Sequence, residues 1–294
     1  MSLNSKPLFD QYCSRHIRPL SVYHFSAIAG WKDFFEFKYD VINDTLCVFA
    51  YQGKDSFLYL PPLGGDIDKA IVEECFKRMA KSRIARIENI SANQLSILDS
   101  RTYNSHLKAH EYVYLRRDLE MLSGDKYKSK RHDSNVFQER FPQAVFRPYT
   151  AADYQGCLNL YSGWSANRRQ SGGDVVYLTM LDENTKVHAL FMQHANALDL
   201  VGRVVEIDGK IAAYTFGYAL SPDTFCVLLE ITDLDKTGLA AYIFQHFCAD
   251  DVVKPFEYIN TMDDFGLPNI AKAKESYHPV KKLPVYTISK KDQT

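Results

Sequence analysis

The chain has 294 residues, 46% of them hydrophobic, and is therefore long enough for one large or two ordinary globular domains. Its 35 basic and 36 acidic residues give a net charge of -1, which argues against a general nucleic-acid or membrane-surface coat. No apolar run approaches the roughly 18 residues of a spanning helix, and the start MSLNSKPLFD lacks a secretory signal core, so we expect a cytoplasmic protein without a transmembrane segment.

The first half carries strand and helix patterns in a definite order. The expected elements are the strand LCVFAYQ, the strand SFLYLPPL, a helix from Asp66, the strand RIARIEN, a helix through Leu98 and the strand EYVYLRR. Gly53-Lys54-Asp55 predicts a turn between the first two strands. Ser91 with Gln94 predicts a capping box at the start of the second helix.

A basic connector, SGDKYKSKRHDSNVFQERF at 123–141, lies between the halves. If this segment is helical, Lys126 and Lys130 share one stripe, and Arg131 and Asn135 lie on the next. Arg and Lys donors converging in this way suit a phosphate or a carboxylate. A solvated, charged helix is the alternative interpretation.

A helix capped by Thr150 and Asp153 opens the second half. The elements after it repeat the order of the first half, with one more strand at the start. The expected elements after it are the strands GRVVEI, KIAAYTFGYAL and FCVLLEIT, the helix GLAAYIFQHF, the strand FEYIN, a short helix ending near KAKES and the strand LPVYTI. Asp208-Gly209 predicts a hairpin turn. We therefore expect an α+β protein with two tandem domains, 1–122 and 145–294, joined by the connector 123–144.

Several motifs resemble those of one family. The stretch YLRRDLEMLSGDKYKSKRHDSNVFQERFP is similar to the Y-x-x-x-D-L-x-x-L-x-G-x-K-x-x-x-K-R-N-x-x-x-x-F signature of the phosphatidylglycerol lysyltransferase C-terminal domain family. PPLG, VGRVVEIDGKIAAYTFG and DFGLPNIAKAKESYHP also agree, so the resemblance spans nearly the whole chain. It implies two tandem domains of the GNAT acyltransferase type, as in Fem-type aminoacyltransferases, with helices packed on mixed, mainly antiparallel sheets.

The chain departs from the family pattern at four positions. His132 stands where Asn is usual, Thr261 and Met262 replace an Arg-Glu pair, and Ala271 replaces an Arg. We therefore expect a divergent member. We also expect a stand-alone one, because full-length relatives carry a membrane flippase ahead of this domain, whereas this chain has no membrane part. Those relatives use aminoacyl-tRNA to modify lipid headgroups.

The resemblance also implies partners. We expect aminoacyl-tRNA or acyl-CoA as a co-substrate, no tightly bound cofactor, and a small-molecule, peptide or lipid-headgroup acceptor. The oligomeric state cannot be read from these residues.

In GNAT folds, the donor pyrophosphate rests on backbone amides at the start of a helix that follows the central strands. The corresponding loop here is DLDKTGLAA, in which Gly238 matches a glycine of the family loop. Asp235 occupies the Gln/Arg position and would repel a phosphate, which disfavours coenzyme A relative to a bulkier donor. Gly238 taken alone also fits an ordinary helix N-terminus.

Acyl transfer needs a base that takes the acceptor proton and dipoles that stabilise the developing oxyanion. Glu230, inside the apolar strand LLEIT, is the candidate base, because burial would raise its pKa. Strand alternation could instead turn it toward solvent.

The family's terminal motif supplies the other candidates. Tyr277 is a candidate proton donor, and Lys274 is a candidate ligand for a donor phosphate or carboxyl group. Asn260 and Asp264 are carried over as substrate-binding residues. Asp264 capping a helix and Tyr277 filling core are the alternatives.

Cysteine and histidine patterns indicate neither disulfides nor metal. The six cysteines are widely separated and form no C-x-x-C pair, which favours reduced thiols. None of the nine histidines forms a pair such as H-E-x-x-H.

Two hypotheses follow. The first is a GNAT-type aminoacyl- or acyltransferase acting on an amine or hydroxyl acceptor. The second is a non-catalytic module that binds a small phosphorylated or carboxylated ligand. An enzyme needs Glu230 or Tyr277 near the same cavity as Lys130 and Arg131, whereas a binding module needs only the cations.

Overall fold

The computed structural model of the chain describes residues 1–15, 20–170 and 175–291. The chain forms two compact units that interleave along the sequence. Unit 1 comprises Met1–Tyr112, Met262–Lys274 and Lys281–Thr294, and unit 2 comprises Val113–Thr261 and Glu275–Val280. The C-terminal strand therefore belongs to the same unit as the N-terminal half.

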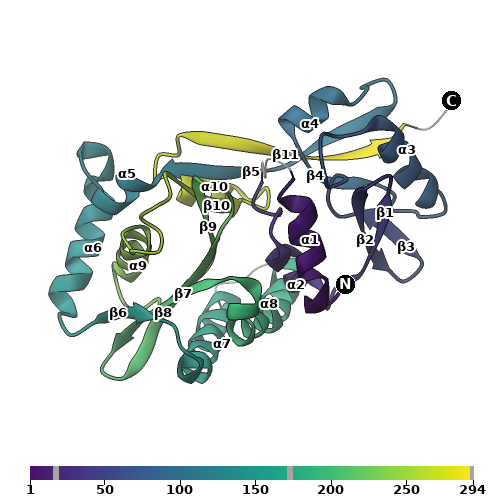
Figure 1. Cartoon of the computed structure of the whole chain (residues 1–294). Coiled ribbons are helices and arrows are strands. Elements are labelled where there is room, and N and C mark those ends of the chain that lie inside the picture. Colours follow the sequence, from purple (N-terminus) through teal and green to yellow (C-terminus); the bar gives the residue numbers. More distant parts are fainter. Residues whose placement is uncertain (16–19, 171–174, 292–294) are drawn as a thin grey trace. The chain divides into compact units, whose positions relative to one another are not determined.

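Unit 1 contains most of the first-half elements and the end of the chain (Figure 1). In chain order these are η1 (Leu3–Ser5), α1 (Lys6–Cys13), α2 (Phe25–Trp31), β1 (Glu36–Ile42), β2 (Thr45–Gln52), β3 (Asp55–Leu58), α3 (Lys69–Arg78), β4 (Ile87–Ser91), α4 (Ala92–Ile97), β5 (Tyr103–Leu115), α10 (Pro268–Glu275) and β11 (Lys281–Lys290). The strand order in this unit is β1-β2-β3-β4-β11-β5. The last three residues of β5 and the last residue of α10 belong to unit 2.

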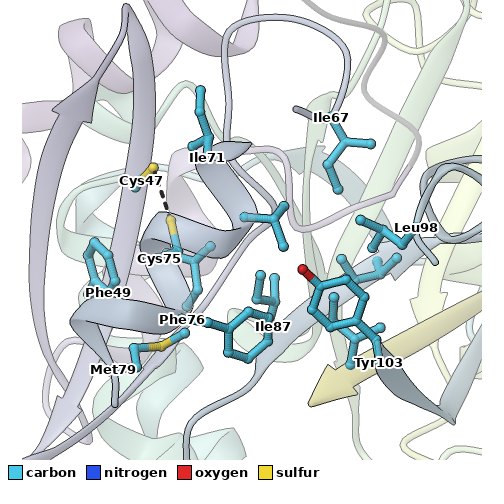
Figure 2. Close-up of a cluster of buried hydrophobic side chains, with 14 residues drawn as sticks. Cys47, Phe49, Ile67, Ile71, Cys75, Phe76, Met79, Ile87, Leu98 and Tyr103 are labelled. Atoms are coloured by element: carbon cyan, nitrogen blue, oxygen red, sulfur yellow. Dashed lines mark hydrogen bonds between the residues drawn. The ribbon is translucent and has the colours of Figure 1, made fainter. Parts of the chain in front are cut away.

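Helix α3 supplies one wall of a buried core in unit 1. Its apolar residues at helical spacing face β2 and β4, and Asp68 caps its N-terminus by accepting a hydrogen bond from the Ala70 amide. Figure 2 shows the cluster, in which the Cys75 thiol of α3 donates to the Cys47 sulfur of β2 at 3.5 Å. The apolar stripe of this helix thus forms one side of the core.

Unit 2 holds the basic connector and most of the second half (Figure 1). Its elements are α5 (Arg116–Met121), η2 (Asp125–Tyr127), α6 (Lys128–Arg140), β6 (Val145–Pro148), η3 (Ala151–Asp153), α7 (Tyr154–Gln170), α8 (Val175–Gln193), η4 (Asn196–Leu198), β7 (Val201–Ile207), β8 (Lys210–Ala219), β9 (Thr224–Thr232), α9 (Leu239–Cys248) and β10 (Tyr258–Asp263). The strand order is β10-β9-β8-β7-β6. The last two residues of β10 fall in unit 1.

Helices cover both faces of the unit 2 sheet. Helices α7 and α8 run side by side and pack on β8, where His188 Nδ1 and the Tyr214 hydroxyl are 2.8 Å apart (Figure 1). Helix α6 packs along α9, and the Phe137 and Tyr242 rings lie 4.7 Å apart between them. The connector helix is therefore built into the core of unit 2.

The two units repeat one pattern of strand pairing. In unit 1, β1, β2 and β3 are antiparallel neighbours, helix α3 follows, and β4 pairs parallel with β3. In unit 2, β7, β8 and β9 are antiparallel neighbours, helix α9 follows, and β10 pairs parallel with β9. The sheets are thus mixed and mainly antiparallel, and the repeated element order expected from the sequence is confirmed.

Local signals in the sequence agree with the structure. The capping boxes of Ser91 with Gln94 and of Thr150 with Asp153 are both present. The turn Asp208-Gly209 has positive φ at both residues, as a two-residue hairpin of this type requires. Several further elements were not predicted from the sequence: α1, α2, β1, α5, β6 and α8.

No helix in the described ranges is both long enough and apolar enough to cross a bilayer.

Candidate active site

Strands β9 and β10 of unit 2 diverge soon after they begin to pair. Their parallel ladder covers only Thr224, Phe225 and Cys226 of β9, although β9 continues to pair with β8 as far as Thr232. A bulge between β8 and β9 places Leu228 as an extra residue in β9. The second half of β9 is therefore supported by β8 while its pairing with β10 has ended.

Glu230 lies on this diverging segment of β9. It is directly opposite Thr215 of β8, whereas its neighbour Ile231 is opposite Tyr214, which contacts α8. Because opposed residues of an antiparallel pair share a face, Glu230 lies on the face away from α7 and α8. This is the face covered by α9, so strand alternation turns Glu230 toward protein and not toward open solvent.

One oxygen of the Glu230 carboxyl group is buried without a hydrogen-bond partner in the described part of the chain. The residue as a whole is half-buried, but its Oε2 atom is inaccessible to solvent and has no hydrogen-bond partner among the described residues. Burial raises the pKa of Glu230 from 4.5 to about 8. At this pKa the group is mostly protonated at pH 7, and the carboxylate form that acts as a general base increases as the pH approaches 8.

Tyr277 lies near Glu230. Burial raises the pKa of Tyr277 well above its usual range, and the neighbouring charge of Glu230 adds to this effect. The Phe244 ring of α9 meets the Tyr277 ring edge-on at 5.0 Å. The Tyr127 hydroxyl donates to the Tyr277 carbonyl at 3.1 Å, which fixes the backbone of this residue.

Lys130 contacts Tyr277 from the connector helix. Its Nζ atom lies 4.4 Å from the centre of the Tyr277 ring, a cation–π distance. Burial lowers the pKa of Lys130, and the nearby Asp133 partly opposes this shift. Tyr277 thus contacts Lys130 directly and lies within electrostatic range of Glu230, and we call these three residues of unit 2 the candidate cluster.

The other polar residues of the connector have different surroundings. Arg131 donates through Nη1 to the carbonyls of Leu122 and Gly124, the latter at 3.2 Å, and so ties α6 to the end of α5. Lys126 is exposed and forms an ion pair with Asp118 at 3.2 Å. Asn135 is exposed. Lys126, Lys130 and Arg131 each contact a different partner, so the structure does not direct these three donors toward one point.

Gly238 is explained by close packing. It precedes α9 with φ +86°, and a Cβ atom there would lie 2.0 Å from the Asp133 carbonyl oxygen of α6. The backbone of α6 therefore occupies the space beside this helix start. Asp235, in the loop before Gly238, is exposed.

The remaining predicted residues lie on β10 and beyond it. Asn260 is buried and pairs with Cys226 in the β9–β10 ladder. Asp264 and Lys274 belong to unit 1, where Asp264 accepts from the Tyr112 hydroxyl at 2.7 Å. Lys274 donates to the Met262 carbonyl at 3.3 Å. Both of these residues hold the turn between β10 and α10 in place.

Two residues beside the candidate cluster were missed by the sequence analysis. Phe244 and Cys248 are one turn apart on α9, so both lie on one side of that helix. Burial raises the pKa of Cys248, and Glu230 contributes to the shift. Their i, i+4 spacing is a signal for a helix face, but nothing local indicates that this face meets Glu230. The described residues contain no group of three His, Cys, Asp or Glu side chains that could hold a metal ion.

Solved structures with similar folds agree with the repeated pattern of the two units. A conserved protein of unknown function from Bacteroides thetaiotaomicron has a TM-score of 0.85 and 26% identity, over 99% of this chain and 98% of that one. The C-terminal domain of a putative lysylphosphatidylglycerol synthetase from Agrobacterium fabrum has a TM-score of 0.65 and 16% identity, over 98% and 92%. A tandem GNAT protein from the clavulanic acid biosynthesis pathway has a TM-score of 0.50 and 8% identity, over 100% and 98%.

The fold is therefore of the tandem GNAT type. The family described as phosphatidylglycerol lysyltransferase, C-terminal, matches residues 16–289. The chain belongs to this family, as its motifs suggested. No curated protein matches the chain. The family and the fold support a transferase of the acyltransferase type.

Proposed function

We propose that the chain is an aminoacyl- or acyltransferase that moves an acyl group from an activated donor to an amine or hydroxyl acceptor. Glu230 is the general base, Tyr277 is the proton donor to the leaving group, and Lys130 binds an anionic group of the donor. The observation that carries this proposal is the buried Oε2 atom of Glu230, which has no partner in the described part of the chain. A buried polar atom without a partner is costly to the fold and is typical of a site completed by a ligand.

The reaction needs two proton transfers. One removes a proton from the attacking acceptor atom, and the other adds a proton to the departing donor atom. The Glu230 carboxylate accepts the proton of the acceptor N–H or O–H as that atom bonds to the donor carbonyl carbon. The bond from this carbon to the ester oxygen or thioester sulfur of the donor then breaks. The Tyr277 hydroxyl donates a proton to the departing atom, and Lys130 stays beside the Tyr277 ring.

Aminoacyl-tRNA is the donor that these surroundings favour over acyl-CoA. A coenzyme A pyrophosphate would need open backbone amides at the start of α9. At Gly238 this space is taken by the Asp133 carbonyl of α6, and Asp235 adds negative charge nearby. The acceptor is a small amine, a peptide or a lipid headgroup. A lipid, phosphatidylglycerol, stands in the name of the family and in that of the Agrobacterium relative.

A donor-consumption assay tests the proposal. The purified protein is offered a panel of charged tRNAs and acyl-CoAs, each with lipid, peptide and small-amine acceptors, and loss of the donor is followed over time. We expect consumption of at least one aminoacyl-tRNA. Glu230→Gln should lower the rate by roughly 100-fold or more, which is the usual scale for loss of a general base. Tyr277→Phe should also lower it.

Glu139→Gln is the matched control, because Glu139 is exposed on α6. It should leave the rate unchanged. Equal rates for Glu230→Gln and the unmodified protein would remove Glu230 from the mechanism. If no donor is consumed but a phosphorylated or carboxylated ligand binds, the chain is a binding module.

A further inference from the structure

Unit 2 contains a cavity of about 280 Å³ beside α7 that is not part of the cluster around Glu230. One face of α7 lines it with Asn159, Gly163, Trp164 and Asn167. The segment that follows β9 closes the other side with Asp233 and Asp235. Its volume is near the lower end of small-molecule pockets, which run from roughly 300 to 1,000 Å³.

Gly163 is the feature of this cavity that packing does not explain. Glycine in a helix interior is less stable than alanine. The other glycine of α7, Gly156, has a packing reason, because a Cβ atom there would lie 2.8 Å from Ile211. At Gly163 a Cβ atom would meet no atom within 4 Å. Gly163 is exposed, so the missing side chain leaves this side of the cavity open to solvent at some expense to the helix.

The charges and rings of the lining favour a cation. Asp233 and Asp235 carry negative charge, and the cavity is lined by no Lys or Arg from the described residues. Asp233 also forms an ion pair with Lys236 at 3.3 Å, so Asp235 is the stronger candidate partner for a ligand. A phosphate or carboxylate ligand would be repelled here.

The indole of Trp164 is suited to the same kind of ligand. The Arg168 guanidinium already lies 5.2 Å from the Trp164 ring centre, which shows that this ring takes a cation on its face. Tyr161 stacks against Trp164 at 5.8 Å and holds its orientation. The amides of Asn159 and Asn167 supply hydrogen-bonding groups to the same cavity.

We propose that this cavity is a second binding site of unit 2, which takes a small organic cation with an ammonium group on an apolar stem. The stem lies along Gly163 and Trp164, and the ammonium group lies at Asp235. Asp233 and Asp235 also belong to the loop before α9, but no residue of this cavity is assigned a proton transfer in the proposed reaction.

Tryptophan fluorescence gives a direct test, because the chain has two tryptophans, Trp31 and Trp164. In a Trp31→Phe background, the signal reports on Trp164 alone. The probes are n-hexylamine, n-hexanol and hexanoate, which share one stem and differ in charge. We expect a saturable change with n-hexylamine, binding at least tenfold weaker for n-hexanol, and no response to hexanoate.

Gly163→Leu should fill the cavity and weaken n-hexylamine binding at least tenfold. Its thermal midpoint should be unchanged or higher, because leucine favours a helix more than glycine does. Ser162→Leu is the matched control, since Ser162 is exposed on the same helix and does not line the cavity. Asp235→Asn should weaken the amine without affecting the alcohol.

Three results would overturn the proposal. They are the absence of saturable amine binding, equal affinity for amine and alcohol, and unchanged binding by a folded Gly163→Leu variant. Activity in the donor assay has no bearing on these outcomes, so the two proposals fail separately.

Discussion

The ammonium nitrogen of Lys130 lies 4.4 Å from the centre of the Tyr277 ring. This contact joins the basic connector to the terminal segment of unit 2, and it separates Lys130 from its neighbour Arg131. Arg131 is engaged by the carbonyls of Leu122 and Gly124. Two adjacent cations therefore have different roles, one at the candidate site and one in the fold.

Substitution of these two cations should separate their roles. Arg131→Met removes charged hydrogen bonds to two carbonyls and should lower the free energy of unfolding by about 2 kcal/mol. Lys130→Met keeps the aliphatic packing on Tyr277 and should change the free energy of unfolding by less than about 1 kcal/mol. The same substitution should weaken donor use. Urea denaturation measures both stability changes, and Lys128→Met on the exposed side of α6 is the control. A larger stability loss for Lys130→Met than for Arg131→Met would contradict this division.

Glu230 should make the fold less stable as the pH rises. Its pKa is raised from 4.5 to about 8 by burial, so between these values the folded state holds a proton that the unfolded state has released. Each pH unit in this window should remove up to about 1.4 kcal/mol of stability, with no further loss above pH 8. Below pH 4.5 both states are protonated, and Glu230 makes no such contribution.

Glu230→Gln should abolish the loss of stability that Glu230 causes between pH 4.5 and pH 8. Urea denaturation of both proteins from pH 5 to pH 8 should show the variant gaining stability relative to the parent as the pH increases. The titration of groups common to both proteins cancels in the difference between their free energies of unfolding. Parallel stability profiles across this range would show that the folded-state pKa of Glu230 is not raised.

Gly238 and Gly209 provide a matched pair of glycine substitutions. Both have positive φ, but a Cβ atom at Gly238 would lie 2.0 Å from the Asp133 carbonyl, whereas one at Gly209 would meet no atom within 4 Å. Gly209→Ala should therefore cost about 1 kcal/mol from backbone strain alone. Gly238→Ala should cost about 3 kcal/mol, because α6 must also shift. Thermal or urea unfolding measures the difference, and equal losses would mean that α6 does not close over the start of α9.

The cysteine thiols should be unreactive in the folded protein. All six are buried and none is in a disulfide in the described part of the chain, and the hydrogen bond with Cys47 (Figure 2) together with burial raises the pKa of Cys75. A disulfide-exchange reagent should react slowly in native buffer and should modify six thiols in denaturant. Rapid modification of Cys47 or Cys75 in native buffer would contradict the packing of this cluster.

Much of the fold could be predicted because its signals are local. The Asp208-Gly209 turn, the capping box of Ser91 with Gln94, and the apolar stripe of α3 each depend on neighbouring residues. Strand β1 was missed because most of its side chains are exposed and it carries no clear alternation. Its hairpin turn, at 43–44, was missed with it.

The candidate site could be predicted only in part. Alternation left Glu230 free to face either side of β9, and only the packing of α9 decides which side is buried. Arg131 was assigned to a cationic stripe and Gly238 to a donor loop. The sequence does not reveal the contacts that the structure gives them, with the Leu122 carbonyl and with the Asp133 carbonyl of α6. The cavity beside Gly163 was missed because it forms between α7 and a loop about 70 residues away.

The proposed mechanism depends on the raised pKa of the Glu230 carboxyl group, which nuclear magnetic resonance measures directly. Protein labelled with ¹³C at the glutamate side-chain carboxyl carbons is titrated from pH 4 to pH 10, and the Glu230 signal is assigned by its loss in Glu230→Gln. We expect this signal to titrate near pH 8, in keeping with a carboxyl group whose Oε2 atom is buried without a partner among the described residues. Titration near the ordinary value of 4.5 would show that the group is solvated or paired, and would contradict its assignment as the base of an acyl transfer.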